Sequence, residues 1–160
     1  MGKNEKTNAM RILDQKGISY ETRSYEHQNE ALDAVKVAEL LQADPWSVFK
    51  TLVLMDAKNT CYVCVIPGPC ELDLKRAAAA FCVKSLRMLH VDELKPYTGY
   101  IRGGCSPIGM KKQYKTLIDS TAIDLPFLFV SAGQIGTQLK LKPSDLLRAS
   151  GAEYAEISRI

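Results

Sequence analysis

VFKTLVLM (residues 48–55) and TCYVCVI (residues 60–66) are two runs of β-branched, aromatic and other apolar residues, joined by DAKN (56–59). Runs of this length and composition, bounded by polar turn residues, are typical of β-strands. The short polar connection favours a hairpin between them. These residues therefore predict an antiparallel strand pair, and the rest of the chain is placed around it.

Helices and strands are interleaved on both sides of this hairpin. Capping residues and apolar spacing predict helices over 7–16, 33–43, 73–81, 92–95 (ending at Pro96) and 143–150. Strands are expected at 18–25, 115–119, 127–131 and 137–141. Several strand connections are too short for a crossover helix. The sequence thus predicts an α/β (α+β) fold, with a mixed, largely antiparallel sheet and helices around it, in one domain over 1–160.

The composition is that of an ordinary globular protein. Of 160 residues, 46% are hydrophobic and 24% are charged. No run approaches the roughly 20 apolar residues that cross a bilayer, and the N-terminus MGKNEKTNAM lacks the apolar core of a secretory signal. The five cysteines, an odd number, indicate reduced thiols. We expect a cytoplasmic protein without membrane association.

Basic residues are concentrated in the second half of the chain. Residues 81–160 contain 11 Lys and Arg against seven Asp and Glu, whereas residues 1–80 contain 10 against 11. A one-sided cationic surface attracts polyanions such as RNA. A solvated lysine face explains the same composition, and no known RNA-binding signature is present.

Lys50 interrupts the apolar run VFKTLVLM. Both faces of the predicted strand are mostly apolar, so the ammonium does not reach water simply by facing outward, and burying it without partners is costly. Either Lys50 extends to the surface or pairs with a carboxylate, or it lies at the floor of a functional cleft. The sequence leaves both possibilities open.

Two segments rich in small residues could approach a ligand closely. GGCSPIG (103–109) follows neither the phosphate-loop pattern nor the dinucleotide fingerprint. VSAGQIG (130–136) ends a predicted strand in small residues. Glycine permits close approach and exposes backbone amides. An ordered loop and a tight turn account for these segments equally well.

The sequence offers no evident protein nucleophile or metal site. His27 and His90 lie in no metal-binding pattern. Cys61 and Cys64 are three apart within a strand and therefore point to opposite faces, as small core residues do. Cys105, in the glycine-rich segment, is a candidate for an exposed cysteine, but no histidine is placed beside it. We expect neither a metal nor any other cofactor.

The order of several motifs resembles the YbaK/EbsC family of bacterial aminoacyl-tRNA deacylases. The similarity extends from about Thr7 to Ile157, and the FKTL and GGCSPIG motifs together make it specific. It is greatest to the freestanding YbaK-type Cys-tRNA(Pro) deacylases. The stretches that carry it are TNAMRILDQKGISYETRSYEH, VFKTLVL, PG…ELDLK, TGYIRGGCSPIGMKK and VSAGQIGTQLKL.

This resemblance implies a barrel-like mixed sheet surrounded by helices, and it implies site residues. The residues expected to act in catalysis are Lys50, Gly103 and Ser131. The residues expected to hold the aminoacyl group are Tyr25, Thr51, Gly104, Ala132 and Gln138. Gln138 departs from members that carry an aspartate there, and its neutral amide offers no charge to the substrate's α-ammonium. Separately from the resemblance, the basic patch of this half of the chain is expected to contact tRNA through Arg102, Lys111, Lys112 and Lys115.

The activity that the resemblance implies is removal of cysteine from Cys-tRNA(Pro), with the substrate's own thiol attacking its ester. The expected partners are the acceptor end of tRNA(Pro) and prolyl-tRNA synthetase. A small pocket discriminates poorly between similar side chains, so an Ala-tRNA(Pro) deacylase is the alternative enzyme. A non-catalytic module that binds tRNA or the synthetase is the alternative of another class.

Overall fold

The predicted hairpin is present in the computed structural model, which describes residues 6–160. It is formed by β2 (Phe49–Met55) and β3 (Cys61–Pro67), which pair antiparallel over their whole length. The expectation of no secretory signal concerns the segment MGKNEKTNAM, whose first five residues lie outside the part of the chain that the structure describes. Both strands are largely buried, as their apolar sequences require.

The hairpin is the centre of a five-stranded sheet with the order β5-β2-β3-β6-β9. The other members are β5 (Arg87–Met88) and β9 (Glu153–Ala155) at the edges and β6 (Lys115–Asp119) between β3 and β9. β6 pairs parallel to β3 and to β9, whereas the pairs that β2 makes are antiparallel. The expectation of a mixed sheet is therefore confirmed.

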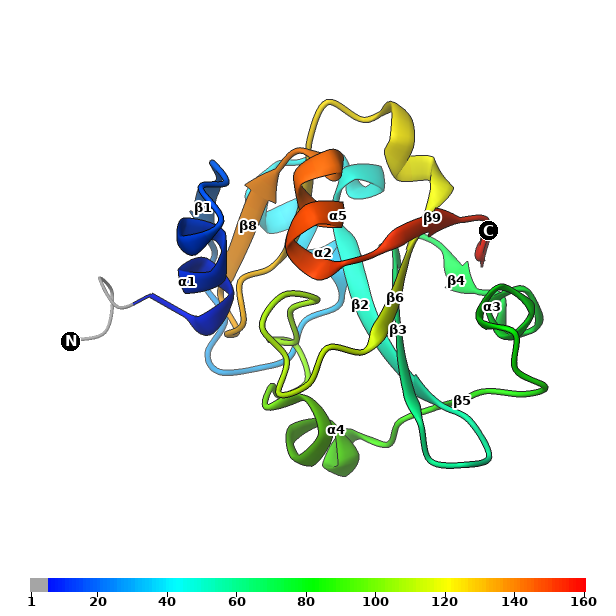
Figure 1. Cartoon of the computed structure of the whole chain (residues 1–160). Helices are drawn as coiled ribbons and strands as arrows, with labels where there is room; N and C mark the ends of the chain where they lie inside the picture. The colour runs from blue at the N-terminus through cyan, green and yellow to red at the C-terminus, as the bar shows by residue number, and fades with distance from the viewer. Residues whose placement is uncertain (1–5) are drawn as a thin grey trace.

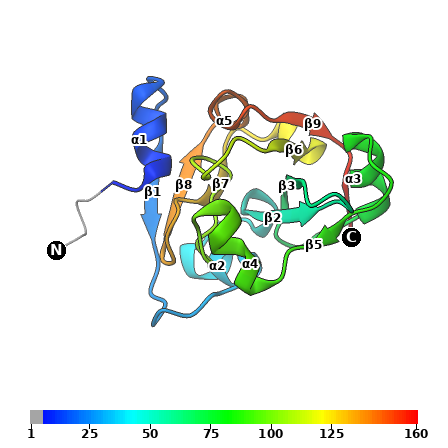
Figure 2. The ribbon, with the colours of Figure 1, turned by 60° about the horizontal axis from the view of Figure 1, so that its bottom comes forward.

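A second sheet lies against the first beyond the start of β2 (Figures 1 and 2). It consists of β1 (Glu21–Ser24), β8 (Thr137–Leu141) and β7 (Leu128–Ser131), all antiparallel in the order β1-β8-β7. A single parallel bridge between Val48 and Phe129 connects β2 with β7. A further pair joins β4 (Glu71–Leu72) to β10 (Ser158–Arg159).

Short helices surround the sheets (Figure 1). The α-helices of residues 6–160 are α1 (Asn8–Gln15), α2 (Ala34–Leu41), α3 (Leu74–Phe81), α4 (Val91–Thr98) and α5 (Pro143–Ser150), and the 3-10 turns are η2 (Pro45–Ser47) and η3 (Ser120–Asp124). Thr7, Asp33 and Asp73 cap α1, α2 and α3 by accepting a backbone N–H with their side chains. The five predicted helices are thus confirmed as helices, although not all of their bounds are the predicted ones.

Two predicted boundaries are wrong. The helix expected to end at Pro96 continues to Thr98, because side chains satisfy its last carbonyls: the Thr98 hydroxyl donates to Leu94 O at 2.7 Å and the Tyr114 hydroxyl to Tyr97 O at 2.6 Å. The strand expected over 18–25 is reduced to β1, since only residues 21–24 find partners on β8.

One hydrophobic cluster is shared by the two larger sheets. It contains Phe49 from β2, Val63 from β3, Val130 from β7 and Leu139 from β8, all buried. Fully burying one such side chain stabilises a fold by about 1.5–3 kcal/mol. This shared core fixes the start of β2 against the end of β7 and the start of β8, which is where the candidate site lies.

Candidate functional site

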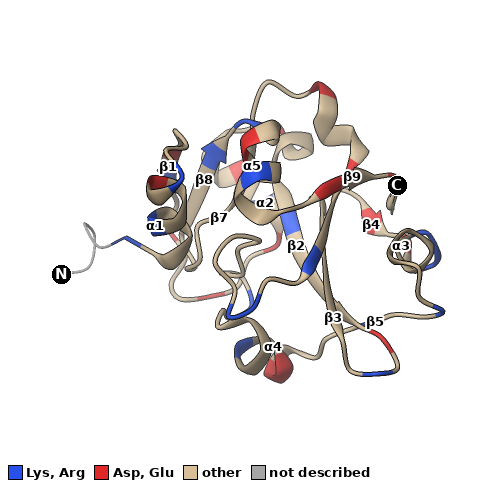
Figure 3. Ribbon diagram, viewed as in Figure 1, with Lys and Arg blue, Asp and Glu red and all other residues tan. Residues whose placement is uncertain are grey.

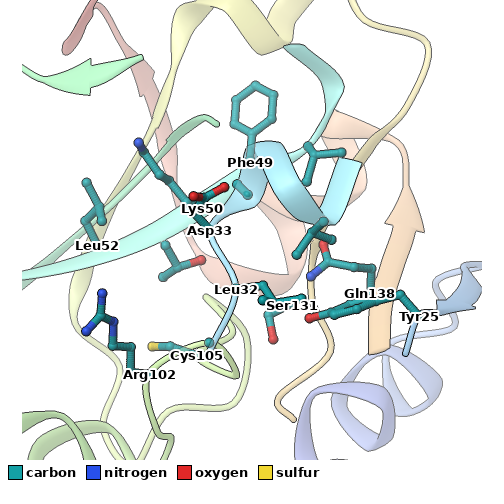
Figure 4. Close-up of a pocket in the computed structure, with 15 residues that line it drawn as sticks. Tyr25, Leu32, Asp33, Phe49, Lys50, Leu52, Arg102, Cys105, Ser131 and Gln138 are labelled. Atoms are coloured by element: carbon teal, nitrogen blue, oxygen red, sulfur yellow. The ribbon is translucent and has the colours of Figure 1, made fainter. Parts of the chain in front are cut away.

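A pocket of about 270 Å³ opens where the start of β2 meets the segment leading into α2, the loop after α4, and the end of β7 beside β8. Figure 4 shows the side chains that line it. Cys105 lies in this lining, as do seven residues expected at the site: Tyr25, Lys50, Thr51, Arg102, Gly103, Ser131 and Gln138. The fold therefore brings together residues from four separate parts of the chain.

Lys50 is half-buried at the start of β2. Its Nζ donates a hydrogen bond to the carbonyl oxygen of Gly68 at 3.1 Å. Gly68 follows β3, and its own N–H donates to Val48 O at 2.8 Å, so the turn after the hairpin is fixed beside β2. No carboxylate within residues 6–160 forms an ion pair with Lys50. Lys50 is therefore a partly exposed lysine that lines a pocket and has no carboxylate partner in the described part of the chain.

The pocket has a charged side, where the Asp33 carboxylate lies with two cationic side chains, and a neutral side. In Figure 4 the Lys50 ammonium and the Arg102 guanidinium lie on one side, and Tyr25, Ser131 and Gln138 lie on the other. Arg102 is exposed, whereas Ser131 and Gln138 are buried. The arrangement suits a ligand with a charged or strongly polar part at the mouth and a small neutral part inside.

Two buried polar atoms in the lining have no hydrogen-bond partner within residues 6–160: Thr51 Oγ1 and Gln138 Oε1. Gln138 is only 6% exposed, and it lies opposite Ser131 across the β7–β8 pair. Ser131 Oγ accepts a hydrogen bond from the Gly133 N–H at 3.1 Å. An unpaired buried polar group costs about 1–3 kcal/mol. Polar ligand atoms that paired with these groups would recover that free energy.

The glycine-rich loop contacts two other segments closely. Gly103 has a φ of +83°, and a Cβ there would lie 2.8 Å from both Cα and Cβ of Ala31. A Cβ on Gly104 would lie 2.9 Å from the Ile135 backbone nitrogen. The two glycines are therefore required by the approach of neighbouring chain segments, one of which leads into α2 and so borders the pocket.

Cys105 is buried, so the prediction of an exposed thiol is wrong. It is 9% exposed, and burial raises the pKa of its thiol to about 12. At neutral pH this thiol is protonated and is a poor nucleophile. Neither histidine lies in the lining. The lining residues of the described chain therefore supply no activated nucleophile.

Five residues proposed for the site lie outside the lining. The Gly104 N–H donates to Ile101 O at 3.0 Å, so this amide does not face a ligand. Ala132 is fully buried in the core, and its N–H donates to Thr137 O at 3.0 Å. The remaining three are exposed lysines in the loop before β6 and at its first residue, where Figure 3 shows basic positions: Lys111, Lys112 and Lys115.

Asp33 and Leu32 also line the pocket, and the sequence did not single them out. Asp33 is explained locally by its capping of α2, where its Oδ1 accepts from the Lys36 N–H at 2.8 Å. No local signal shows that the segment before α2 lies over the start of β2, because the close packing of Ala31 on Gly103 determines this.

Within residues 6–160, no group of three or more His, Cys, Asp and Glu side chains is arranged to hold a metal ion. In the same part of the chain, no helix has the length and apolar character needed to cross a bilayer.

Comparison with known proteins gives consistent matches. The family model described as "Aminoacyl-tRNA editing domain" matches residues 28–149. A curated relative from Enterococcus faecalis (strain ATCC 700802 / V583), named "Putative Cys-tRNA(Pro)/Cys-tRNA(Cys) deacylase EbsC", is 44% identical over 154 residues, covering 96% of this chain and 94% of the relative.

Solved structures share the fold at lower identity. A hypothetical protein is similar with a TM-score of 0.87 at 22% identity, over 96% of this chain and 100% of the other. A structure titled as a "putative trans-editing enzyme for prolyl tRNA synthetase" has a TM-score of 0.84 at 21% identity, over 96% of each chain. At these identities the likeness establishes the fold, and it agrees with the predicted α+β architecture.

Proposed function

This chain belongs to the aminoacyl-tRNA editing domain family, and on that premise we propose that it is a trans-editing deacylase that removes cysteine from Cys-tRNA(Pro). The substrate is an ester between an amino acid and the terminal ribose of tRNA. We place the reaction in the cytoplasm, where tRNAs are charged. The observation that carries the proposal is that Lys50 and Gly103, far apart in sequence, line one small pocket with unpaired buried polar groups.

The size of the pocket supports an aminoacyl group as the occupant. Its volume of about 270 Å³ is below the range of about 300–1,000 Å³ that is usual for ligand pockets. A single small amino acid suits this space, while the adenosine and the rest of the acceptor end remain outside. The Lys50 and Arg102 side chains then face the ribose and phosphates of the tRNA terminus.

Each predicted residue in the lining has a role that its position supports. Lys50 orients the ester and stabilises the negative charge that develops on the carbonyl oxygen. The backbone at Gly103, which has no side chain to block approach, contacts the aminoacyl carbonyl. Thr51, Ser131 and Gln138 bind the amino acid by hydrogen bonds, and Tyr25 closes the neutral side of the pocket.

The chemical step uses the thiol of the substrate, because the lining offers no activated nucleophile. The substrate sulfur attacks the aminoacyl carbonyl carbon, forming a C–S bond, and the C–O bond to the ribose breaks. The thiol proton ends on the ribose oxygen. The cyclic thioester that leaves is then hydrolysed by water to cysteine. The protein contributes orientation and electrostatic stabilisation, which suffice for an ester that is already reactive.

We propose that the exposed lysines before and at the start of β6 contact the acceptor stem, and that prolyl-tRNA synthetase is a partner. Lys112 and Lys115 are exposed and free to reach phosphates, while Lys111 donates to Pro96 O at 3.3 Å. Phosphate contacts strengthen binding without selecting a sequence. Selection of tRNA(Pro) therefore requires the synthetase or further contacts.

The proposal is tested by deacylation of a panel of charged tRNAs: Cys-, Ala- and Ser-tRNA(Pro), with correctly charged Pro-tRNA(Pro) as the reference. We expect rapid release of cysteine and little release of serine, which has nearly the same size and no thiol. Alanine released faster than cysteine would support the Ala-tRNA(Pro) alternative. Salt-sensitive tRNA binding with no ester cleavage on any substrate would refute the deacylase proposal.

A further inference from the structure

The substrate of the proposed reaction carries a positive α-ammonium group, and the pocket must accommodate that charge. Lys50 and Arg102 repel it. Gln138, where some family members have an aspartate, is neutral. The two unpaired atoms Thr51 Oγ1 and Gln138 Oε1 can accept a hydrogen bond but provide no compensating charge. An acidic side chain elsewhere in the lining would supply that charge.

Asp33 is the only carboxylate among the described residues that line the pocket. One of its oxygens, Oδ1, accepts the α2 capping hydrogen bond from the Lys36 N–H at 2.8 Å. No Lys or Arg of residues 6–160 forms an ion pair with Asp33. A carboxylate accepts about four hydrogen bonds, so Asp33 has acceptor capacity left after capping.

The position of Asp33 is suitable for this contact. The residue is exposed and lies at the N-terminus of α2, and Figure 4 shows its carboxylate on the same side of the pocket as the Lys50 side chain. An aminoacyl ester that enters with its side chain toward Gln138 has both its carbonyl and its ammonium near the mouth. The carbonyl can then face Lys50 while the ammonium faces Asp33.

We propose that the Asp33 carboxylate binds the α-ammonium of the aminoacyl group and thereby makes the enzyme select substrates with a free amine. This inference rests on the deacylase function proposed above. It adds to that function a class of substrates that the enzyme rejects. These are aminoacyl-tRNAs with a blocked nitrogen, such as formylated or peptidyl-tRNAs. These have no charge to offer Asp33, and they place an acyl group against it.

The test compares Cys-tRNA(Pro) with N-acetyl-Cys-tRNA(Pro), prepared with a free thiol, as substrates of the wild type and of Asp33→Asn. Asparagine caps helices as well as aspartate does, so the variant keeps the start of α2 and loses only the charge. Asp73→Asn is the control, because Asp73 caps α3 by accepting from the Arg76 N–H at 3.0 Å and lies outside the pocket lining, although it also forms an ion pair with Arg76 Nε at 3.7 Å.

We expect Asp33→Asn to lower kcat/KM on Cys-tRNA(Pro) about two- to fivefold, mainly through KM, since loss of an exposed ion pair has effects of up to about a factor of five. On the N-acetyl substrate the variant and the wild type should be equal, and Asp73→Asn should match the wild type on both substrates. Because the comparison is made within each substrate, the lower intrinsic reactivity of the acetylated ester cancels.

An equal loss on both substrates would overturn the inference, since it would show that Asp33 does not sense the amine. Unchanged kcat/KM on Cys-tRNA(Pro) would overturn it as well. Failure of the wild type to cleave Cys-tRNA(Pro) is a different result. It would refute the proposed function, and with it the role of Asp33 in binding this substrate.

Discussion

Substituting Gly103 by alanine should both destabilise the protein and impair the pocket. Gly103 has a φ of +83°, and a residue with a Cβ pays about 1–2 kcal/mol in this left-handed region. Part of that cost, about 0.4–1 kcal/mol, is offset because alanine restricts the unfolded chain. The new Cβ would also lie 2.8 Å from Ala31 Cα and Cβ. Overpacking of this kind adds about 1–3 kcal/mol.

Gly17→Ala is the control that separates the two contributions. Gly17 has a φ of +68°, but no atom lies within 4 Å of the position of its Cβ. This variant should lose about 0.5–1 kcal/mol from backbone strain alone, whereas Gly103→Ala should lose about 2–4 kcal/mol. Both should remain folded, since native stability is typically about 5–15 kcal/mol.

The free energies of unfolding can be measured by urea denaturation, followed by fluorescence of the single tryptophan, Trp46. Relief of the contact requires the segment before α2 to move, and this segment carries Leu32 and Asp33 of the lining. We therefore also expect at least about a tenfold loss of deacylation by Gly103→Ala, because small displacements of positioning groups slow catalysis strongly. Equal unfolding free energies for the two variants, with full activity in both, would refute the packing described here.

Further expectations concern thiols, pH and the buried carboxylate of β6. Cys82 is exposed and the other four cysteines are buried, and burial raises the pKa of the Cys64 and Cys105 thiols to about 12. A thiol reagent at pH 8 should therefore modify one cysteine quickly in the native protein and all five after denaturation. Rapid reaction of a second cysteine in the native protein would contradict the burial. Hydrogen bonds from Arg87 and from a backbone N–H lower the pKa of Glu93 from 4.5 to about 2. Because the folded value is the lower one, this stabilisation is complete above pH 4.5 and is lost as the pH falls toward 2. The difference in unfolding free energy between wild type and Glu93→Gln should therefore be constant from pH 7 to 5 and shrink below; a difference that persists at pH 2 would contradict this. Asp119 is 1% exposed and accepts hydrogen bonds from three backbone N–H groups and one hydroxyl, so Asp119→Ala should cost about 3 kcal/mol or more in urea denaturation, and a cost below 1 kcal/mol would contradict those contacts.

The elements predicted correctly are those whose signals are local. The hairpin of β2 and β3 is fixed by two apolar runs and a polar turn, and the helices by caps such as Thr7 and by Gly151 after α5. The short strands β4, β5, β9 and β10 were not predicted, because two or three residues show no periodicity and become strands only through their distant partners.

Of the residues that line the pocket, Lys50 is the one that an anomaly in the sequence indicates, whereas Tyr25, Ser131 and Gln138 were expected only from the family resemblance. Lys50 stands out as a charge in an apolar run, and its placement in the pocket follows from β2. Asp33 shows no such anomaly, because its role as the N-cap of α2 is enough to account for an aspartate at this position. Gly104 and Ala132 lie next to lining residues but their amides are used within the chain, and only the three-dimensional hydrogen bonds show this.

The role of Lys50 can be measured by single-turnover deacylation of preformed Cys-tRNA(Pro) with the wild type, Lys50→Ala and Lys58→Ala. Lys58 is an exposed lysine in the turn between β2 and β3, outside the pocket lining, and its variant controls for the loss of one positive charge. We expect Lys58→Ala to match the wild type and Lys50→Ala to be slower by about 100-fold, which is typical for loss of one group that stabilises a developing oxyanion. Equal rates for Lys50→Ala and the wild type would remove Lys50 from the reaction and contradict the assignment of this pocket as the editing site.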